Sequence, residues 1–135
     1  MTAISPLQSI HKKGLFGNHH KKNESDLLSI TELNDLNIFQ VVQYKNSKID
    51  ISNINIDNLK IPSQNLKVSS NTDTRILWNS PNTWLVISKK NNTLKNILLS
   101  CDSENFGITD ISHSRAVIQI RGKQVKEVLK KGCPI

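Results

Sequence analysis

Aromatic residues are scarce in this sequence: two Trp, one Tyr and three Phe in 135 residues, or 4% of the chain. Hydrophobic residues of all kinds make up 36%. Both values are low for a globular protein, so a thin hydrophobic core is expected. The length leaves room for one domain and one modest core.

Long hydrophobic runs are also missing. One of the longest, residues 84–87, is far too short to cross a bilayer. Residues 1–7 lack the basic start and apolar stretch of a secretory signal. The two cysteines, Cys101 and Cys133, belong to no CxxC pair, which favours reduced thiols over a disulfide. We therefore expect a cytoplasmic protein that makes no contact with a membrane.

Motifs that carry chemistry are absent as well. The sequence contains no GxGxxG or Walker loop, and no GxSxG elbow surrounds the adjacent Ser112 and His113. Asp102, Glu104 and Asp110 do not form an evident acid/base pair. The histidines lack the spacing of a zinc site; they are His11, His19, His20 and His113. We expect no catalytic, cofactor-binding or metal-binding residue in this chain.

What the sequence does have is positive charge, with a net charge of +7. The basic residues concentrate in residues 11–22 and 121–131. Such runs are solvated faces or mobile arms in most proteins, and the alternative is a surface that meets an acidic partner. Lys outnumbers Arg, and no zinc-finger, RNP or helix-turn-helix signature is present, so nucleic acid is not an expected partner.

The order of elements predicts the fold. Residues 1–26 lack hydrophobic periodicity and are expected to form a flexible basic arm, followed by a single α+β domain over residues 27–135. The expected elements are strands at 28–31 and 36–44, a short helix within 50–59, a polar connection at 63–73, a hairpin of 75–78 with 84–88, a helix ending near 100, extended segments at 106–111 and 115–120, and a final helix. This order predicts a ferredoxin-like split βαβ sandwich with a trailing helix.

The final helix carries two glycines with expected roles. Gly122 is expected to open the helix. Gly132 is expected to take the left-handed position after it, with Pro134 preventing its continuation.

Two local features stand out as structural or subunit-interface candidates. Trp78 and Trp84 flank a predicted turn, either as core packing of the hairpin or as an aromatic patch that faces a partner. In the polar stretch 110–117, Asp110 and Ser112 are expected to accept hydrogen bonds from nearby backbone N–H groups. Arg115 is expected to pair with Asp110 or with a carboxylate of a partner.

These features, in this order, carry a resemblance to a known family. Residues 75–87, which include RILW and SPNTWLVI, resemble the "LWLGPDEWLVI" segment of sarcosine oxidase gamma subunits. Residues 109–118, TDISHSRAVI, are similar to their "TDLSHGRTVI" segment. Residues 120–134, which include Gly122 and Gly132, resemble their "LSGPxAxxVLxKGCPxDL" segment.

The resemblance implies a non-catalytic gamma subunit of a heterotetrameric oxidoreductase that acts on CH–NH donors with oxygen as acceptor. In such enzymes sarcosine is demethylated to glycine, and its one-carbon unit passes to tetrahydrofolate. FAD, FMN, NAD, tetrahydrofolate and zinc are expected on the alpha, beta and delta subunits and none on this chain. The implied fold is that of an aminomethyltransferase N-terminal domain, apparently truncated at its C-terminus, because family members continue beyond the "GCPxDL" element. The alternative is a stand-alone module that binds folate or one-carbon units, related to aminomethyltransferases and YgfZ-type proteins.

Overall fold

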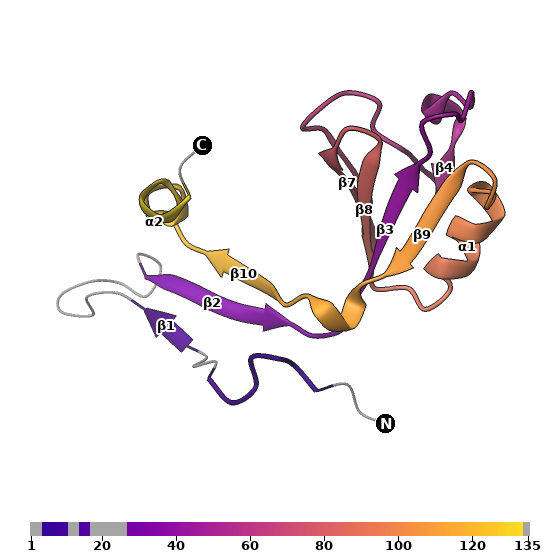
Figure 1. The fold of residues 1–135 in the computed structure, drawn as a ribbon. Coiled ribbons are helices and arrows are strands. Elements are labelled where there is room, and N and C mark those ends of the chain that lie inside the picture. Colours follow the sequence, from indigo (N-terminus) through magenta and orange to yellow (C-terminus); the bar gives the residue numbers. More distant parts are fainter. Residues whose placement is uncertain (1–3, 11–13, 17–26, 134–135) are drawn as a thin grey trace. The chain divides into compact units, whose positions relative to one another are not determined.

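The computed structural model describes residues 4–10, 14–16 and 27–133. Their contacts form two compact units (Figure 1): unit 1 is Met1–Asn34 with Ala116–Ile135, and unit 2 is Asp35–Arg115. Much of the predicted arm, residues 1–3, 11–13 and 17–26, lies outside the described residues, so its flexibility stays a prediction. The single domain expected over residues 27–135 stays a prediction too.

Unit 2 is built on a five-stranded antiparallel sheet in the order β6-β7-β8-β3-β9. The predicted hairpin is present, and its strands are directly paired from Thr74 opposite Ser88 to Ser80 opposite Thr83. The elements of this unit are β3 (Asn37–Gln43), β6 (Val68–Ser70), β7 (Thr74–Ser80), β8 (Thr83–Ser88), α1 (Thr93–Ser100) and β9 (Phe106–Asp110).

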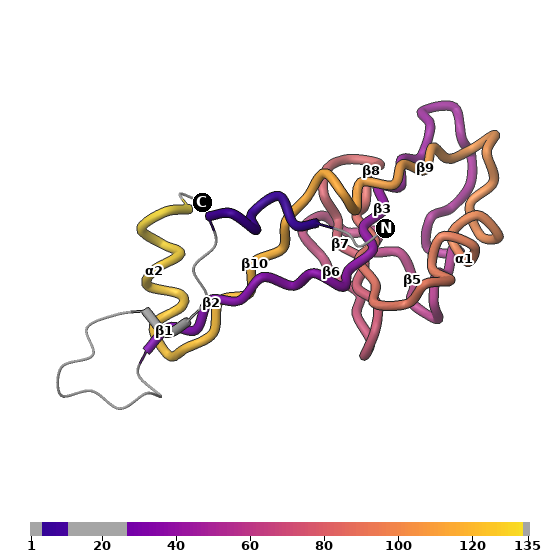
Figure 2. The backbone as a smooth tube through the Cα atoms, turned by 90° about the horizontal axis from the view of Figure 1, so that it is seen from below, coloured from indigo at the N-terminus to yellow at the C-terminus, as the bar shows by residue number. Residues whose placement is uncertain are grey.

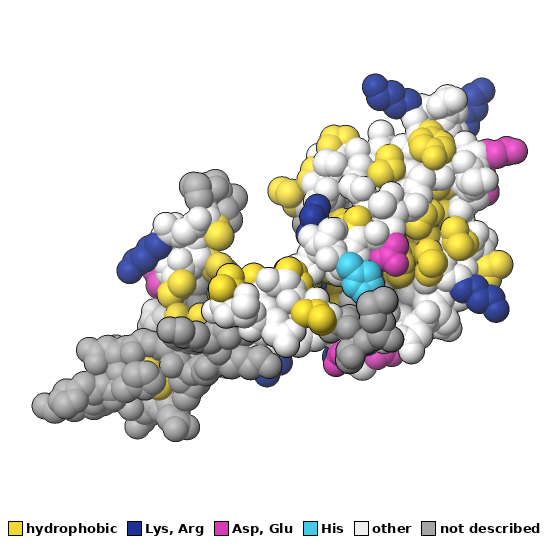
Figure 3. Space-filling model, turned by 60° about the horizontal axis from the view of Figure 1, so that its bottom comes forward, with side chains coloured by type: hydrophobic (Ala, Val, Ile, Leu, Met, Phe, Trp, Pro, Cys, Tyr) yellow, Lys and Arg dark blue, Asp and Glu magenta, His cyan; other side chains and the backbone are white. Residues whose placement is uncertain are grey.

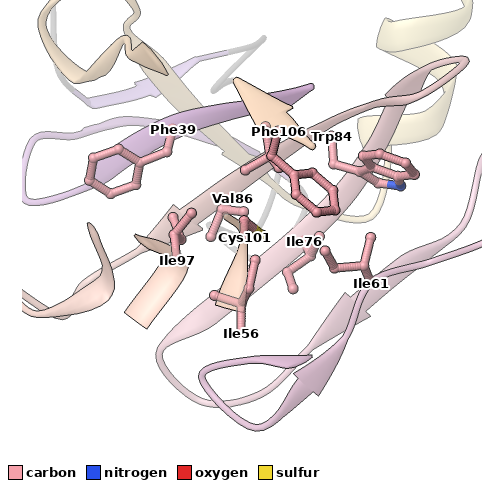
Figure 4. Close-up of a cluster of buried hydrophobic side chains, with 10 residues drawn as sticks. Phe39, Ile56, Ile61, Ile76, Trp84, Val86, Ile97, Cys101 and Phe106 are labelled. Carbon is pink, nitrogen blue, oxygen red and sulfur yellow. The ribbon is translucent and has the colours of Figure 1, made fainter. Parts of the chain in front are cut away.

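The core of unit 2 lies against α1 and follows the alternation of the strands. In β8 the buried residues Trp84, Val86 and Ser88 alternate with half-buried ones, which is the period of two expected for a strand with one covered face. Ile97 of α1 is completely buried against this cluster. Figure 4 shows the cluster, which consists of Phe39, Val41, Ile56, Ile61, Ile76, Trp84, Val86, Ile97, Cys101 and Phe106.

The helix predicted within residues 50–59 is wrong. One 3₁₀ turn, η2 (Ile51–Asn53), is followed by a small hairpin of β4 (Asn55–Ile56) and β5 (Leu59–Lys60). Asp57 and Asn58 form its two-residue loop with φ values of 50° and 65°. Consecutive left-handed residues close a hairpin and cannot continue a helix. The polar connection expected at 63–73 also contains a strand, β6.

Unit 1 contains a three-stranded antiparallel sheet in the order β1-β2-β10 and the second helix, α2. Its elements are β1 (Gly14–Phe16), β2 (Leu28–Leu33), β10 (Val117–Arg121) and α2 (Val125–Gly132). Figure 2 shows β2 and β10 running side by side, although many residues separate them in sequence. Regular structure therefore begins earlier than residue 27, at β1 inside the predicted arm.

The predicted fold class is confirmed: the protein is α+β, and its described residues form antiparallel sheets and two α-helices, consistent with a ferredoxin-like split βαβ arrangement. Neither helix in the described part of the chain has the length and hydrophobicity that crossing a membrane requires.

The role expected of Gly132 is wrong, and Gly122 has a positive φ that the sequence analysis did not predict. Gly132 is the last residue of α2 and does not have a positive φ, so the predicted left-handed position after the helix is wrong. Gly122 lies before α2 with φ +144°. A Cβ there would come within 2.8 Å of the Leu27 carbonyl oxygen and 3.0 Å of Leu28 Cδ2. Only glycine fits this conformation and this close approach without strain.

We expect Gly122→Ala to destabilise unit 1 by about 1–3 kcal/mol, because it adds a strained φ and a clash with backbone. Amide exchange of β2 and β10 measures the effect. Gly132→Ala is the matched control, since nothing lies within 4 Å of its added Cβ and alanine favours a helix by up to about 1 kcal/mol. Equal exchange rates in the two variants would contradict the expectation.

Candidate functional site

The two tryptophans lie directly opposite each other on β7 and β8. Trp84 is 3% exposed, and its indole N–H donates to the carbonyl of Pro62 at 2.8 Å. Trp78 is half-buried and packs against the same core. Asn82, with φ 58°, closes the turn between them. Trp84 is thus a core residue, and only Trp78 keeps part of its surface open.

The polar stretch after β9 is held by Asp110 and Ser112. The Asp110 carboxylate accepts hydrogen bonds from the Ser112 hydroxyl at 2.6 Å and the Ser112 N–H at 2.9 Å. The same hydroxyl accepts the N–H of Ile38, the buried second residue of β3, at 2.8 Å. These bonds fasten the 3₁₀ turn η3 (Ser112–Ser114) to the start of β3. The side chain and then the backbone of Ser112 hold the pKa of Asp110 below its ordinary value.

Arg115 does not pair with Asp110, which corrects that part of the sequence prediction. It is exposed, and its guanidinium donates to the Ser114 carbonyl at 3.3 Å. No ion pair between Arg115 and a carboxylate occurs among the described residues. The hydroxyl and N–H of Ser112 already satisfy the carboxylate, so Arg115 is not needed there. A carboxylate of a partner chain is the remaining predicted role for Arg115.

The most extensive polar cluster centres on Asp57, which the sequence prediction missed. This carboxylate is 8% exposed. It accepts hydrogen bonds from the Thr74 hydroxyl at 2.8 Å, the Thr93 hydroxyl at 2.9 Å and the Asn96 amide at 2.5 Å. The Thr74 hydroxyl also lies 2.8 Å from that of Ser88. One side chain therefore connects the β4–β5 loop, β7 and the first turn of α1, with Ser88 of β8 joined through Thr74.

The ionised form of the Asp57 side chain is favoured although the side chain is buried. Burial by itself raises the pKa of Asp57, but the three hydrogen bonds and the nearby charge of Lys90 outweigh it, so the pKa lies below its ordinary value. A carboxylate at the start of α1 is also favoured by the helix dipole. Asn92, the residue directly before α1, makes no side-chain hydrogen bond to the helix. Asp57 thus supplies the negative group at this helix end.

The remaining titratable groups offer little chemistry. Cys101 is a buried free thiol, and burial, followed by the charge of Asp102, raises its pKa to about 11. A thiol with that pKa is a poor nucleophile at neutral pH. Cys133 is free and exposed. Among the described residues, no group of three His, Cys, Asp or Glu side chains could hold a metal ion. His11, His19 and His20 lie outside the described residues.

An open groove of about 260 Å³ runs along unit 2 beside β5 and β6. Its lining includes two lysines, Lys60 and Lys67, several hydroxyl and amide side chains, and the apolar residues Ile61 and Pro62. Such a surface can accept an anionic group, but it holds no acid/base pair or nucleophile for catalysis.

We expect Asp57→Asn to lower the free energy of unfolding by about 1–3 kcal/mol at pH 7, since buried donors lose a charged acceptor. The folded-state pKa of Asp57 is depressed, so its contribution is present above the unfolded value of about 3.9 and is lost as pH falls through the folded value. Urea unfolding at pH 7 and at decreasing pH should therefore show a narrowing difference between wild type and variant. Glu104→Gln, at an exposed carboxylate, is the control, and a difference that widens toward acid would contradict the assignment.

Ser112→Ala is expected to destabilise unit 2 by about 1–3 kcal/mol, because it leaves the buried N–H of Ile38 without its acceptor. Arg115→Ala should change stability by less than about 0.5 kcal/mol, as a surface substitution does. Thermal unfolding of both variants checks this. An equal loss in Arg115→Ala would mean that the arginine pairs with Asp110 in solution.

Of three comparisons with known proteins, the one with solved structures supports the fold. No family model and no curated protein matches the chain. Among solved structures, a chain of the heterotetrameric sarcosine oxidase from Corynebacterium sp. U-96, in complex with pyrrole 2-carboxylate, is similar with a TM-score of 0.66 and 19% sequence identity. The similarity covers 82% of this chain and 58% of the solved chain, so this chain spans little more than half of that length. This protein therefore has the fold of a chain found in heterotetrameric sarcosine oxidase.

Proposed function

We propose that this chain is a non-catalytic, gamma-type subunit of a heterotetrameric sarcosine oxidase. The observation that carries the proposal is the shared fold, with a TM-score of 0.66 over 82% of the chain. The segments at 75–87, 109–118 and 120–134, which resemble gamma-subunit motifs, support it independently. The alpha, beta and delta subunits are the proposed partners, and the cytoplasm is the proposed location.

The polar clusters of the chain support a structural role. Asp57 and Asp110 each accept two or more hydrogen bonds from donors within unit 2, as Asp50 also does. A general base must reach a proton of a substrate, and these carboxylates are committed to neighbouring donors. We therefore assign the oxidation of sarcosine and the transfer of its one-carbon unit to tetrahydrofolate to the other subunits. FAD, FMN, NAD, tetrahydrofolate and zinc belong to those subunits in this proposal.

Co-expression of the full chain with the alpha-, beta- and delta-type subunits of its source organism tests the proposal. We expect one complex in size-exclusion chromatography that contains all four chains and produces hydrogen peroxide from sarcosine. The isolated chain should produce no peroxide above a heat-killed control and should retain no flavin after dialysis. Peroxide from the isolated chain, or the absence of any complex, would overturn the proposal.

A further inference from the structure

Unit 1 buries few side chains of its own. Among its described residues with assigned burial, only Leu27 and Glu32 are buried, and α2 contains no buried residue. Unit 2, by contrast, has a contiguous buried cluster. A sheet with one helix is stable only when the apolar faces of both are covered, and the described residues of unit 1 do not cover all of theirs.

The register of the sheet shows where this surface lies. Ile118 is directly opposite Glu32, and Ile120 is directly opposite Ile30. Directly paired residues point to the same side, so Ile118 and Ile120 share one face with Ile30 and Leu28. Ile118 is 48% exposed. Glu32, at the end of this face, accepts a hydrogen bond from the Ser5 hydroxyl.

The helix α2 adds a second apolar strip. Val125, Val128 and Leu129 lie at the i, i+3 and i+4 spacing of one helix face. Val128 is 41% exposed and Leu129 is 42% exposed. Figure 3 shows hydrophobic side chains gathered on α2 and on the neighbouring strands of unit 1.

The strand β10 is also an edge of its sheet among the described residues. On an edge strand, the N–H and C=O groups of every second residue point away from the neighbouring strand. An extended segment of another polypeptide can pair with such an edge through its own main chain. The hydrogen-bonding chemistry of this surface therefore fits a β-strand.

The charge around the surface determines which strand would fit. Residues 121–133 contain five basic residues and one acidic residue, Glu127, which pairs with Lys130 at 3.1 Å. Helical spacing places Lys126 and Lys131 on either side of the apolar strip of α2. A second copy of this chain would bring the same basic residues to the contact, where like charges repel. An acidic segment would instead be attracted.

We propose that the β10 edge and the apolar strip of α2 form a docking surface for an extended segment of a partner subunit that alternates acidic and apolar residues and adds a strand to the sheet of unit 1. This inference rests on the proposed function, because it takes the partner to be another subunit of the same complex. The apolar side chains of the segment cover Ile118 and Val128, and its carboxylates face Lys126 and Lys131.

The test uses the full chain and the purified assembly of co-expressed alpha-, beta- and delta-type subunits, with affinity measured by biolayer interferometry. Ile118→Lys should weaken binding at least tenfold, because it places a charge where an apolar side chain docks. The double variant Lys126→Glu with Lys131→Glu should slow association and reduce its dependence on salt. Leu99→Lys is the matched control, since Leu99 is 76% exposed on α1 of unit 2, and it should bind within about twofold of wild type.

Hydrogen exchange of the unsubstituted chain gives a second measurement that needs no variant to fold. Amides of residues 117–121 should gain protection when the complex forms. If the complex forms but these amides gain none and Ile118→Lys binds as Leu99→Lys does, the docking surface is wrong and the proposed function stands. A homodimer of the isolated chain that Ile118→Lys disrupts would show that a second copy occupies the surface, which also overturns the inference. If no complex forms, the proposed function and the inference fail together.

Discussion

The buried carboxylate of Asp57 is the interaction on which the arrangement of unit 2 most depends. It accepts hydrogen bonds from Thr74, Thr93 and Asn96, which belong to β7 and α1. A buried charge is stable only when donors surround it, so each of these elements has to be in place for the others to be satisfied. The hydrophobic cluster beside it is non-directional, whereas these hydrogen bonds specify one orientation of α1 on the sheet.

The same residue explains the main failure of prediction from sequence. Ile51, Ile54 and Leu59 have nearly helical spacing, which suggested a helix within residues 50–59. The information against a helix lies in the Asp57-Asn58 pair, since both residues tolerate the left-handed conformation that a two-residue hairpin loop requires. The left-handed conformation of Asp57 is fixed only by tertiary contacts, because Thr74, Thr93 and Asn96, which bind its carboxylate, lie later in the sequence.

Elements whose determinants are local were predictable. The hairpin of β7 and β8 follows from two short apolar runs, residues 76–78 and 84–87, on either side of a Pro-Asn turn. The helix α1 follows from the spacing of Leu94, Ile97 and Leu98. Ser112 lies two residues from Asp110, so the hydrogen bond between them could be predicted from the sequence. Arg115 was not predictable in the same way, because a long exposed side chain finds its partner in three dimensions. The positive φ of Gly122 was not predictable for a related reason: the close approach of Leu27 to Gly122 is a tertiary contact.

The two units differ in how fully their apolar side chains are buried and their polar groups hydrogen-bonded. The docking surface that we propose rests on this difference. In unit 2 the sheet is covered by α1, and the buried polar side chains Asp57, Thr74 and Ser88 bind one another. In unit 1 the side chains of Ile118, Val128 and Leu129 are more than 40% exposed, and β10 is an edge among the described residues. A unit whose apolar and polar side chains are covered is stable by itself. A unit with exposed apolar side chains and an open strand edge is stabilised when another surface covers them. If the chain is the non-catalytic subunit that we propose, its contribution to the complex is the free energy released when a partner covers the exposed apolar side chains of unit 1.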